Sequence, residues 1–143
     1  MGLQKIKLHT VFRDNKLNHQ IISGLKEKKV LITGATGGIG SSLVRMFANE
    51  GATIGIHYHQ NQKQAKSLLR DIEIDGVNAK CFQADLLSTN ELTLVQQFIE
   101  QFDSIDILVN NAGGVLGLKD FLEVDESAWT ETHRLNIQAP FFL

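Results

Sequence analysis

Short apolar runs alternate with longer amphipathic stretches along the chain from Lys29 onward. The apolar runs are of strand length, whereas the stretches between them repeat apolar residues at helical spacing. This alternation is typical of a parallel sheet built from right-handed βαβ units. The predicted strands are KVLIT (29–33), ATIGIHY (52–58), VNAKCFQADL (77–86) and DILVN (106–110).

The stretches between and after these runs predict four helices, and so an α/β fold with a doubly wound parallel sheet of about four strands. The first helix ends at Gly51, and the second begins after Asn61, a suitable N-cap, and ends at Gly76. Ser88 and Glu91 are spaced as a reciprocal capping pair for the third helix. That helix is predicted to bury Leu92, Val95, Ile99 and Phe102. In the first helix Ile39, Leu43 and Phe47 keep helical spacing, and the last helix runs from about Asp125 to the end.

Charge is distributed unevenly along the 143 residues. Residues 1–29 carry seven Lys or Arg and two Asp or Glu, which gives this segment a net charge of +5. Residues 30–143 carry seven Lys or Arg and fourteen Asp or Glu, a net charge of −7, so the whole chain has a net charge of −2. Aromatic residues are not interleaved with the basic charges, which argues against a nucleic-acid partner. We interpret residues 1–24 as an N-terminal extension and residues 25–143 as one domain.

Two further properties of the sequence bear on location. Cys81 is the single cysteine, so no disulfide can form within the chain. No apolar run reaches the length of about 18 residues that a membrane span requires. We therefore expect a cytoplasmic protein that does not enter a membrane.

The stretch TGATGGIG (33–40) places four glycines between a predicted strand and a predicted helix. Such a loop directs free backbone N–H groups and the positive end of a helix dipole at one point, which suits a phosphate. A Walker loop is excluded because no lysine lies near Gly40, and the strict G-x-G-x-x-G pattern fails because Leu43 stands at its third glycine. The spacing fits T-G-x-x-x-G-x-G through Thr33, Gly34, Gly38 and Gly40, and also T-G-x-x-G-x-x-G through Gly34, Gly37 and Gly40.

Three later motifs resolve this ambiguity. NNAG (110–113) ends the fourth predicted strand, ADL (84–86) ends the third, and LNIQAPFFL (135–143) lies in the last helix. Together with the loop they resemble the non-extended branch of the short-chain dehydrogenase/reductase family, over residues 25–143. The resemblance implies a Rossmann-type fold, a nicotinamide dinucleotide as cofactor, and hydride transfer to or from a carbonyl or alcohol.

The resemblance also implies a role for individual residues. Asp85 would accept a hydrogen bond from the adenine amine, Leu86 would lie along the adenine ring, and Asn110 would tie the sheet together. The pyrophosphate would lie against the loop that Thr33 opens. Its contacts would be Gly34, Gly38, Ile39 and Gly40, and the adenosine ribose would lie beside Asn111, Ala112 and Gly113.

The residues that end the second predicted strand bear on the choice of dinucleotide. An acid there would hydrogen-bond the ribose 2′-hydroxyl and repel a 2′-phosphate. Counting from Gly51 places Tyr58 at this position, followed by His59, Gln60 and Asn61, with no carboxylate. We therefore expect NADP(H) to be preferred over NAD(H). With no third ligand in view, His57 and His59 are interpreted as polar strand-end residues and no metal is expected.

Of the four catalytic residues that the family uses, the chain holds one, Asn136, which would hold a water of the proton relay. The Tyr-x-x-x-Lys motif is missing, because Tyr58 is the single tyrosine and Gln62 stands four places later. We therefore expect a truncated, cofactor-binding Rossmann domain that is incomplete on its C-terminal side and does not reduce a ketone by itself.

Three explanations for the incomplete domain are open, and we favour the first because residues 25–143 show no decay of the family motifs. The chain is the front portion of a normal enzyme, or it pairs with a second chain, or it is a non-catalytic dinucleotide-binding or interaction module. DILVN would form an apolar sheet edge and PFFL an exposed end, so a homo-oligomer is expected. GATIGIHYHQNQKQA (51–65) most resembles 3-oxoacyl-acyl-carrier-protein reductases and sugar or polyol dehydrogenases.

Overall fold

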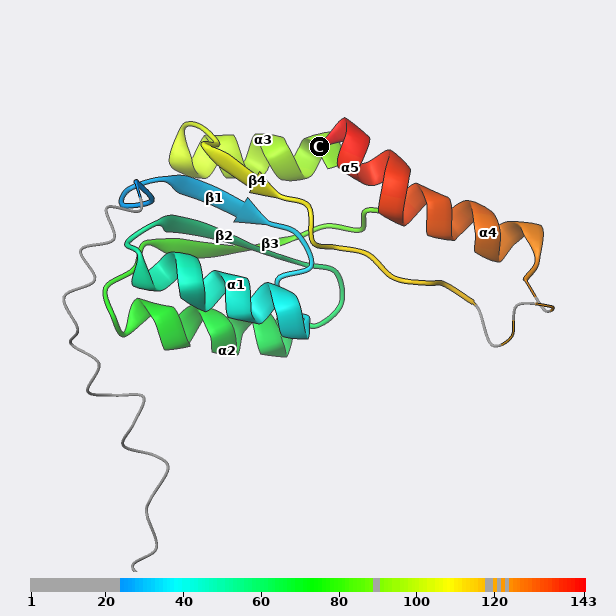
Figure 1. Ribbon diagram of the computed structural model, residues 1–143. Coiled ribbons are helices and arrows are strands. Elements are labelled where there is room, and N and C mark those ends of the chain that lie inside the picture. The colour runs from blue at the N-terminus through cyan, green and yellow to red at the C-terminus, as the bar shows by residue number, and fades with distance from the viewer. Residues whose placement is uncertain (1–23, 89–90, 118–119, 121, 123) are drawn as a thin grey trace, which may run out of the picture.

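A computed structural model describes residues 24–88, 91–117, 120, 122 and 124–143, so the interpretation of residues 1–23 as an extension lies outside the described residues. The sheet has four parallel strands in the order β3-β2-β1-β4. From the inner strand β1 the chain moves outward through β2 and β3 and crosses back to β4 (Figure 1). The strands are β1 (Lys29–Ile32), β2 (Thr53–Tyr58), β3 (Ala79–Gln83) and β4 (Ile107–Val109).

Helices cover both faces of the sheet. α1 (Gly38–Asn49) and α2 (Gln62–Glu73) lie on one face, and α3 (Glu91–Phe102) lies on the other (Figure 1). Since side chains alternate along a strand, Val30 and Ile32 pack towards α1 and α2 while Leu31 packs towards α3. The predicted doubly wound parallel sheet is therefore confirmed.

The helices on the first face largely follow the sequence pattern. Asn61 caps α2, since its Oδ1 accepts from the Gln64 N–H at 3.3 Å, and Gly76 follows the helix with φ +79°. In α1, Ile39 is 73% exposed, and the helix packs through Val44 and Phe47.

The buried face of α3 differs more from its prediction. Leu92 is 62% exposed and Ile99 is 42% exposed, whereas Leu94 and Phe98 are fully buried. The Phe98 ring lies on β2 at Gly55, where an added Cβ would approach it to 2.5 Å. Glycine in the strand thus leaves room for an aromatic cluster, in which the Phe98 centroid is 5.6 Å from that of Phe82 and 5.0 Å from that of Phe102.

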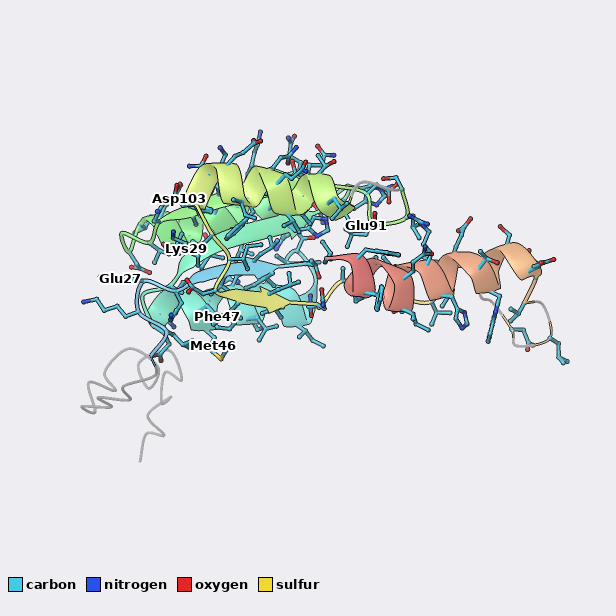
Figure 2. The ribbon with its side chains drawn as sticks, turned by 90° about the horizontal axis from the view of Figure 1, so that it is seen from above. Glu27, Lys29, Met46, Phe47, Glu91 and Asp103 are labelled. Atoms are coloured by element: carbon cyan, nitrogen blue, oxygen red, sulfur yellow. The ribbon has the colours of Figure 1, made fainter. Side chains whose placement is uncertain are left out.

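The last predicted helix is a continuous helical run with a wider turn inside it. It consists of α4 (Glu126–His133), a π-helical segment (Arg134–Gln138) and α5 (Ala139–Phe142). Asp125 caps its start, with Oδ1 accepting from the Ala128 N–H at 2.7 Å. The run extends beyond the sheet, and Figure 2 shows its side chains standing around the ribbon. Among the described helices, none has the length and apolar character to cross a membrane.

Candidate functional site

The carboxyl ends of the parallel strands meet at one edge of the sheet, where open α/β sheets bind their ligands. A cavity of about 540 Å³ lies there, between the loops that follow the strands. Seven predicted site residues line it, and they come from loops far apart in the sequence. They are Gly34, His59, Asn61, Asp85, Leu86, Ala112 and Gly113.

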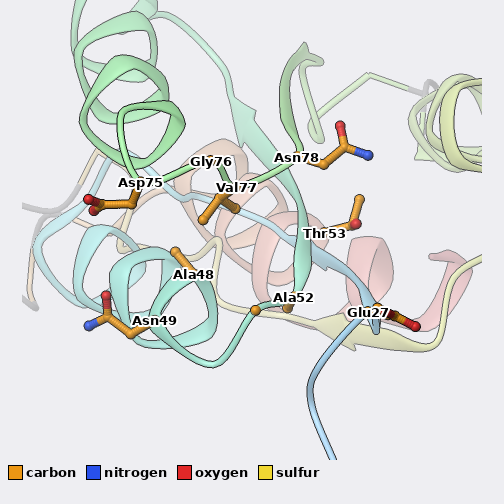
Figure 3. A pocket seen from close by; sticks show the side chains of 10 residues that line it. Glu27, Ala48, Asn49, Ala52, Thr53, Asp75, Gly76, Val77 and Asn78 are labelled. Atoms are coloured by element: carbon orange, nitrogen blue, oxygen red, sulfur yellow. The ribbon is translucent and has the colours of Figure 1, made fainter.

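A second hollow, of about 510 Å³, lies at the opposite edge of the sheet (Figure 3). It is lined by the end of α1, the start of β2 and the connection from α2 to β3, and it contains no predicted site residue. Its charged lining residues are Glu27 and Asp75, both acidic. An anionic ligand would be repelled there, so the cavity at the carboxyl ends is the better candidate.

The glycines of the first loop divide into two kinds. Gly34 has φ +60°, and a Cβ there would lie 2.8 Å from Ala112 Cα. A Cβ on Gly40 would overlap the Gly34 carbonyl oxygen, so both glycines are required by the close packing of the loop itself. A Cβ on Gly38 would meet no protein atom within 4 Å. Gly38 therefore leaves open backbone through which a ligand can approach the start of α1.

A hydrogen-bond network under the cavity joins the loop after β1 to the loop after β4. Thr33 is 1% exposed, and its Oγ1 accepts from the N–H groups of Asn111 at 3.0 Å and Ala112 at 2.9 Å. The Asn111 Nδ2 group donates to the carbonyl oxygens of Thr33 at 2.8 Å and Gly34 at 3.1 Å. The role of sheet tie, predicted for Asn110, thus belongs to Asn111, because the turn after β4 directs the Asn111 side chain towards the glycine loop.

His57 is a site residue whose role the sequence did not reveal. It is 2% exposed, its Nδ1 accepts from the Gly34 N–H at 3.0 Å, and its Nε2 lies 3.1 Å from the Ala84 carbonyl oxygen. These partners assign the neutral tautomer with the proton on Nε2. His57 therefore connects the glycine loop to the end of β3 from beneath the cavity.

Protonation of His57 would disturb this arrangement. Burial is the largest influence on the pKa of His57 and lowers it, the hydrogen bond to Ala84 acts in the opposite direction, and the charge of His59 lowers it further. A protonated ring would place an N–H where Nδ1 now accepts from Gly34. Because both of its ring nitrogens are engaged with backbone groups, His57 acts as a structural connector.

The interpretation of Tyr58 as a ligand contact is wrong. Tyr58 is 5% exposed and belongs to the core under α1 and α2. It is still part of β2, so alternation along the strand places it on the same face as Ile54 and Ile56. His59, the first residue after β2, is exposed and lines the cavity in its place.

The loop after β3 forms another wall of the cavity. Asp85 Oδ1 accepts from the Leu87 N–H at 3.0 Å and lies 3.8 Å from His59 Nε2. Leu86 is 4% exposed and joins the core under α3 while its surface lines the cavity. The loop thus offers an acidic group beside an apolar surface.

Arg134, on the π-helical segment, supports this loop and was missed in the sequence. Its Nη2 donates to the Ser88 carbonyl oxygen at 2.9 Å and to Glu91 Oε1 at 3.2 Å, and its Nε donates to the Leu87 carbonyl oxygen. Figure 2 shows Glu91 where α3 begins. The predicted capping pair is therefore wrong, since Glu91 pairs with Arg134 and the Ser88 hydroxyl donates to the Asp85 carbonyl oxygen at 2.6 Å.

Asn136 lies on the same π-helical segment and holds the loop after β4. Its Oδ1 accepts from the Gly114 N–H at 3.1 Å, and its Nδ2 donates to the carbonyl oxygens of Gly114 and Thr132, both at 2.7 Å. A Cβ on Gly113 would come within 2.7 Å of Asn136 Oδ1. The Asn136 side chain therefore positions the loop after β4. That it also holds a water of the proton relay stays a prediction.

Comparison of this chain with known proteins identifies a matching family and similar sequences. A family model described as short chain dehydrogenase matches residues 28–143. The 3-oxoacyl-acyl-carrier-protein reductase FabG of Staphylococcus aureus (strain Mu50) is 30% identical over 115 residues, which are 80% of this chain and 46% of the relative. The chain thus spans about half the length of this curated relative.

Two solved structures have the same arrangement of strands and helices. One is an NADH-dependent reductase, A1-R′, complexed with NAD, at 34% identity and a TM-score of 0.77 over 85% of this chain and 51% of that one. The other is a short chain dehydrogenase of Burkholderia cenocepacia J2315 in complex with NADP, at 30% identity and a TM-score of 0.77 over 82% of this chain and 48% of that one.

Proposed function

The chain belongs to the short-chain dehydrogenase family, and from this premise we propose that its cavity at the carboxyl ends of the strands holds a nicotinamide dinucleotide. The observation that carries the proposal is the open backbone at Gly38, at the start of α1. There the N–H groups of the first helical turn and the helix dipole favour a pyrophosphate. Gly34, Asp85 and Ala112 line the cavity where the adenosine half of the cofactor would lie.

We propose that the chain supplies the cofactor-binding portion of an oxidoreductase. When bound, the reduced dinucleotide would give a hydride to a carbonyl, and the oxidised dinucleotide would accept one from an alcohol. The residues of this chain orient the dinucleotide, through loops that His57, Asn111 and Arg134 hold in place. The likeness to the Staphylococcus aureus reductase supports a 3-oxoacyl thioester as the substrate class.

NADP(H) is the proposed preference over NAD(H). The residues at the cavity after β2 are His59, Gln60 and Asn61, none of which is acidic. A 2′-phosphate therefore meets no carboxylate from this loop, and a ribose 2′-hydroxyl lacks the acid that usually binds it. The two neighbouring structures were solved with NAD and with NADP respectively, so relatives of this fold take either form.

The binding proposal is tested with a pair of glycine variants. Gly38→Ala adds a methyl group where no protein atom lies within 4 Å, so the fold should be unchanged. The methyl group would separate the backbone from the pyrophosphate, and we expect NADPH to bind about tenfold more weakly or worse. Fluorescence titration of NADPH and NADH measures the dissociation constants.

Gly114→Ala is the matched control for this pair. Gly114 also has no protein atom within 4 Å of an added Cβ, but it lies in the loop after β4 and not at the start of α1, so binding should stay at the wild-type level. Equal affinity of Gly38→Ala and wild type would contradict the proposed place of the pyrophosphate. NADH binding as tight as NADPH would contradict the preference.

We further propose that the protein works in the cytoplasm as a homo-oligomer. Within the described residues β4 has β1 as its neighbour on one side, and the C-terminal run exposes Phe141 at 82% and Ile137 at 61%. Apolar surface of this kind favours association. Light scattering at several concentrations tests this, and a monomer at every concentration would contradict it.

A further inference from the structure

His59 has a particular place at the edge of the proposed cofactor site. Because Tyr58 turns into the core, His59 is the first side chain after β2 that reaches the cavity. Its side chain is 49% exposed, so it is accessible to a ligand. Its backbone is held in place, since the Gln83 Nε2 group donates to the His59 carbonyl oxygen at 3.0 Å.

The charges around His59 come from three elements. Asp85, after β3, has its Oδ1 at 3.8 Å from His59 Nε2, and His57, on β2, interacts with it electrostatically. Lys63 lies in the first turn of α2, exposed and outside the residues that line the cavity. Among the described lining residues, the basic side chains are His57 and His59, and His57 has both ring nitrogens engaged. His59 is thus the lining residue that can present a positive charge to a ligand.

We propose that protonation of His59 sets the choice between the two dinucleotides, so that a 2′-phosphate is favoured at acidic pH. The proposal rests on the proposed function and adds regulation to the same site. With neutral His59, the lining carries the negative charge of Asp85 and disfavours a second anion. With protonated His59, that charge is balanced and an N–H donor is available to the phosphate.

The two dinucleotides differ at the ribose 2′ position, which carries a phosphate in NADP(H) and a hydroxyl in NAD(H). The ribose 2′-hydroxyl of NAD(H) is uncharged and therefore does not respond to the charge of His59. The ratio of the two affinities thus isolates His59, because a change at His57 alters the glycine loop that both dinucleotides share.

The experiment measures dissociation constants of NADPH and NADH at about pH 8 and about pH 6 for wild type and His59→Gln. Glutamine keeps a hydrogen-bond donor but cannot become charged. For wild type we expect the preference for NADPH to rise about three- to fivefold from the higher to the lower pH, the scale of one exposed ion pair. A phosphate itself titrates near pH 6, and His59→Gln retains that contribution, so the difference between the two proteins reports on His59.

Other outcomes are equally informative. The same pH dependence in wild type and His59→Gln would overturn the proposal. The proposal would also be overturned if the preference for NADPH lost its pH dependence in Lys63→Gln but kept it in His59→Gln. Lys63 on α2 would then be the group responsible. Failure of the wild-type chain to bind either dinucleotide at either pH would instead refute the proposed function. A far-UV circular dichroism spectrum and a urea midpoint that match wild type would show that His59→Gln keeps its fold.

Discussion

The base and the rim of the cavity use their side chains in opposite ways. At the base, Thr33, His57 and Asn111 are engaged with backbone groups of the loops around them. At the rim, the His59 side chain is about half exposed, and Gly38, which follows the lining residue Gly37, has open space beside it. The difference shows that a cofactor-binding motif contains two kinds of residue, those that shape the loops and those left available to the ligand.

This comparison predicts where substitutions cost stability. Gly40→Ala should have the largest effect, because its Cβ would overlap Gly34 and come within 2.8 Å of Ala35 Cα and Asn111 Nδ2. We expect a loss of about 3 kcal/mol in the free energy of unfolding, measured by urea denaturation. Gly38→Ala is the matched control and should stay within about 0.5 kcal/mol of wild type. Equal stability of Gly40→Ala and Gly38→Ala would contradict the distinction between residues that the packing of the loops requires and residues left available to a ligand.

A smaller loss is expected for Thr33→Val. The substitution keeps the shape of the side chain but removes the oxygen that accepts from Asn111 and Ala112. The Asn111 N–H also lies 3.0 Å from the Val109 carbonyl oxygen, so the Ala112 N–H is the donor left without this partner. We expect a loss of about 2 kcal/mol by urea denaturation, and near wild-type stability for Thr33→Ser, which keeps the hydroxyl. A stable Thr33→Val protein would show that the hydroxyl does not hold the loops.

The smallest expected effect is the change of the free energy of unfolding with pH. Since burial lowers the pKa of His57, the unfolded chain takes up a proton before the folded chain does. The contribution of neutral His57 is therefore present above about pH 6.5 and is lost as the pH falls towards the folded pKa. Urea denaturation at about pH 7.5 and pH 5.5 should show lower stability at the acidic value.

A histidine elsewhere supplies the control for this pH effect. His133→Gln alters the end of α4 and leaves His57 in place, so it should keep the wild-type pH dependence. His57→Gln removes the titrating ring and should reduce that dependence. If both variants behave like wild type, His57 does not couple pH to stability.

Much of the fold was predictable because it depends on local pattern. The four strands, the N-cap at Asn61 and the face of α2 formed by Ala65, Leu68 and Ile72 follow from spacing and from side-chain chemistry that acts over one or two helical turns. The prediction for α3 failed for Leu92 and Ile99, although Phe102 is buried as predicted, because apolar residues lie on more than one side of this helix. The space over Gly55, which Phe98 fills, then selected the face that packs.

Within the candidate site, the pattern marked the right loops but not the task of each residue. The assignment to Tyr58 failed by one position, since β2 continues through residue 58 and strand alternation places that side chain in the core. The link from Arg134 to Glu91 joins residues 43 positions apart, and no local spacing reports such a pair.

By itself the sequence determined the succession of strands and helices along the chain and the position of the glycine loop, because these depend on local spacing. The family followed from the resemblance of its motifs to those of known members. The tertiary structure decided which glycines the packing requires, that His57 and Asn111 hold the loops, and that His59 rather than Tyr58 faces the cavity. The physical reason is that these roles depend on contacts between segments far apart in sequence. Such contacts exist only once the sheet brings the ends of its strands together.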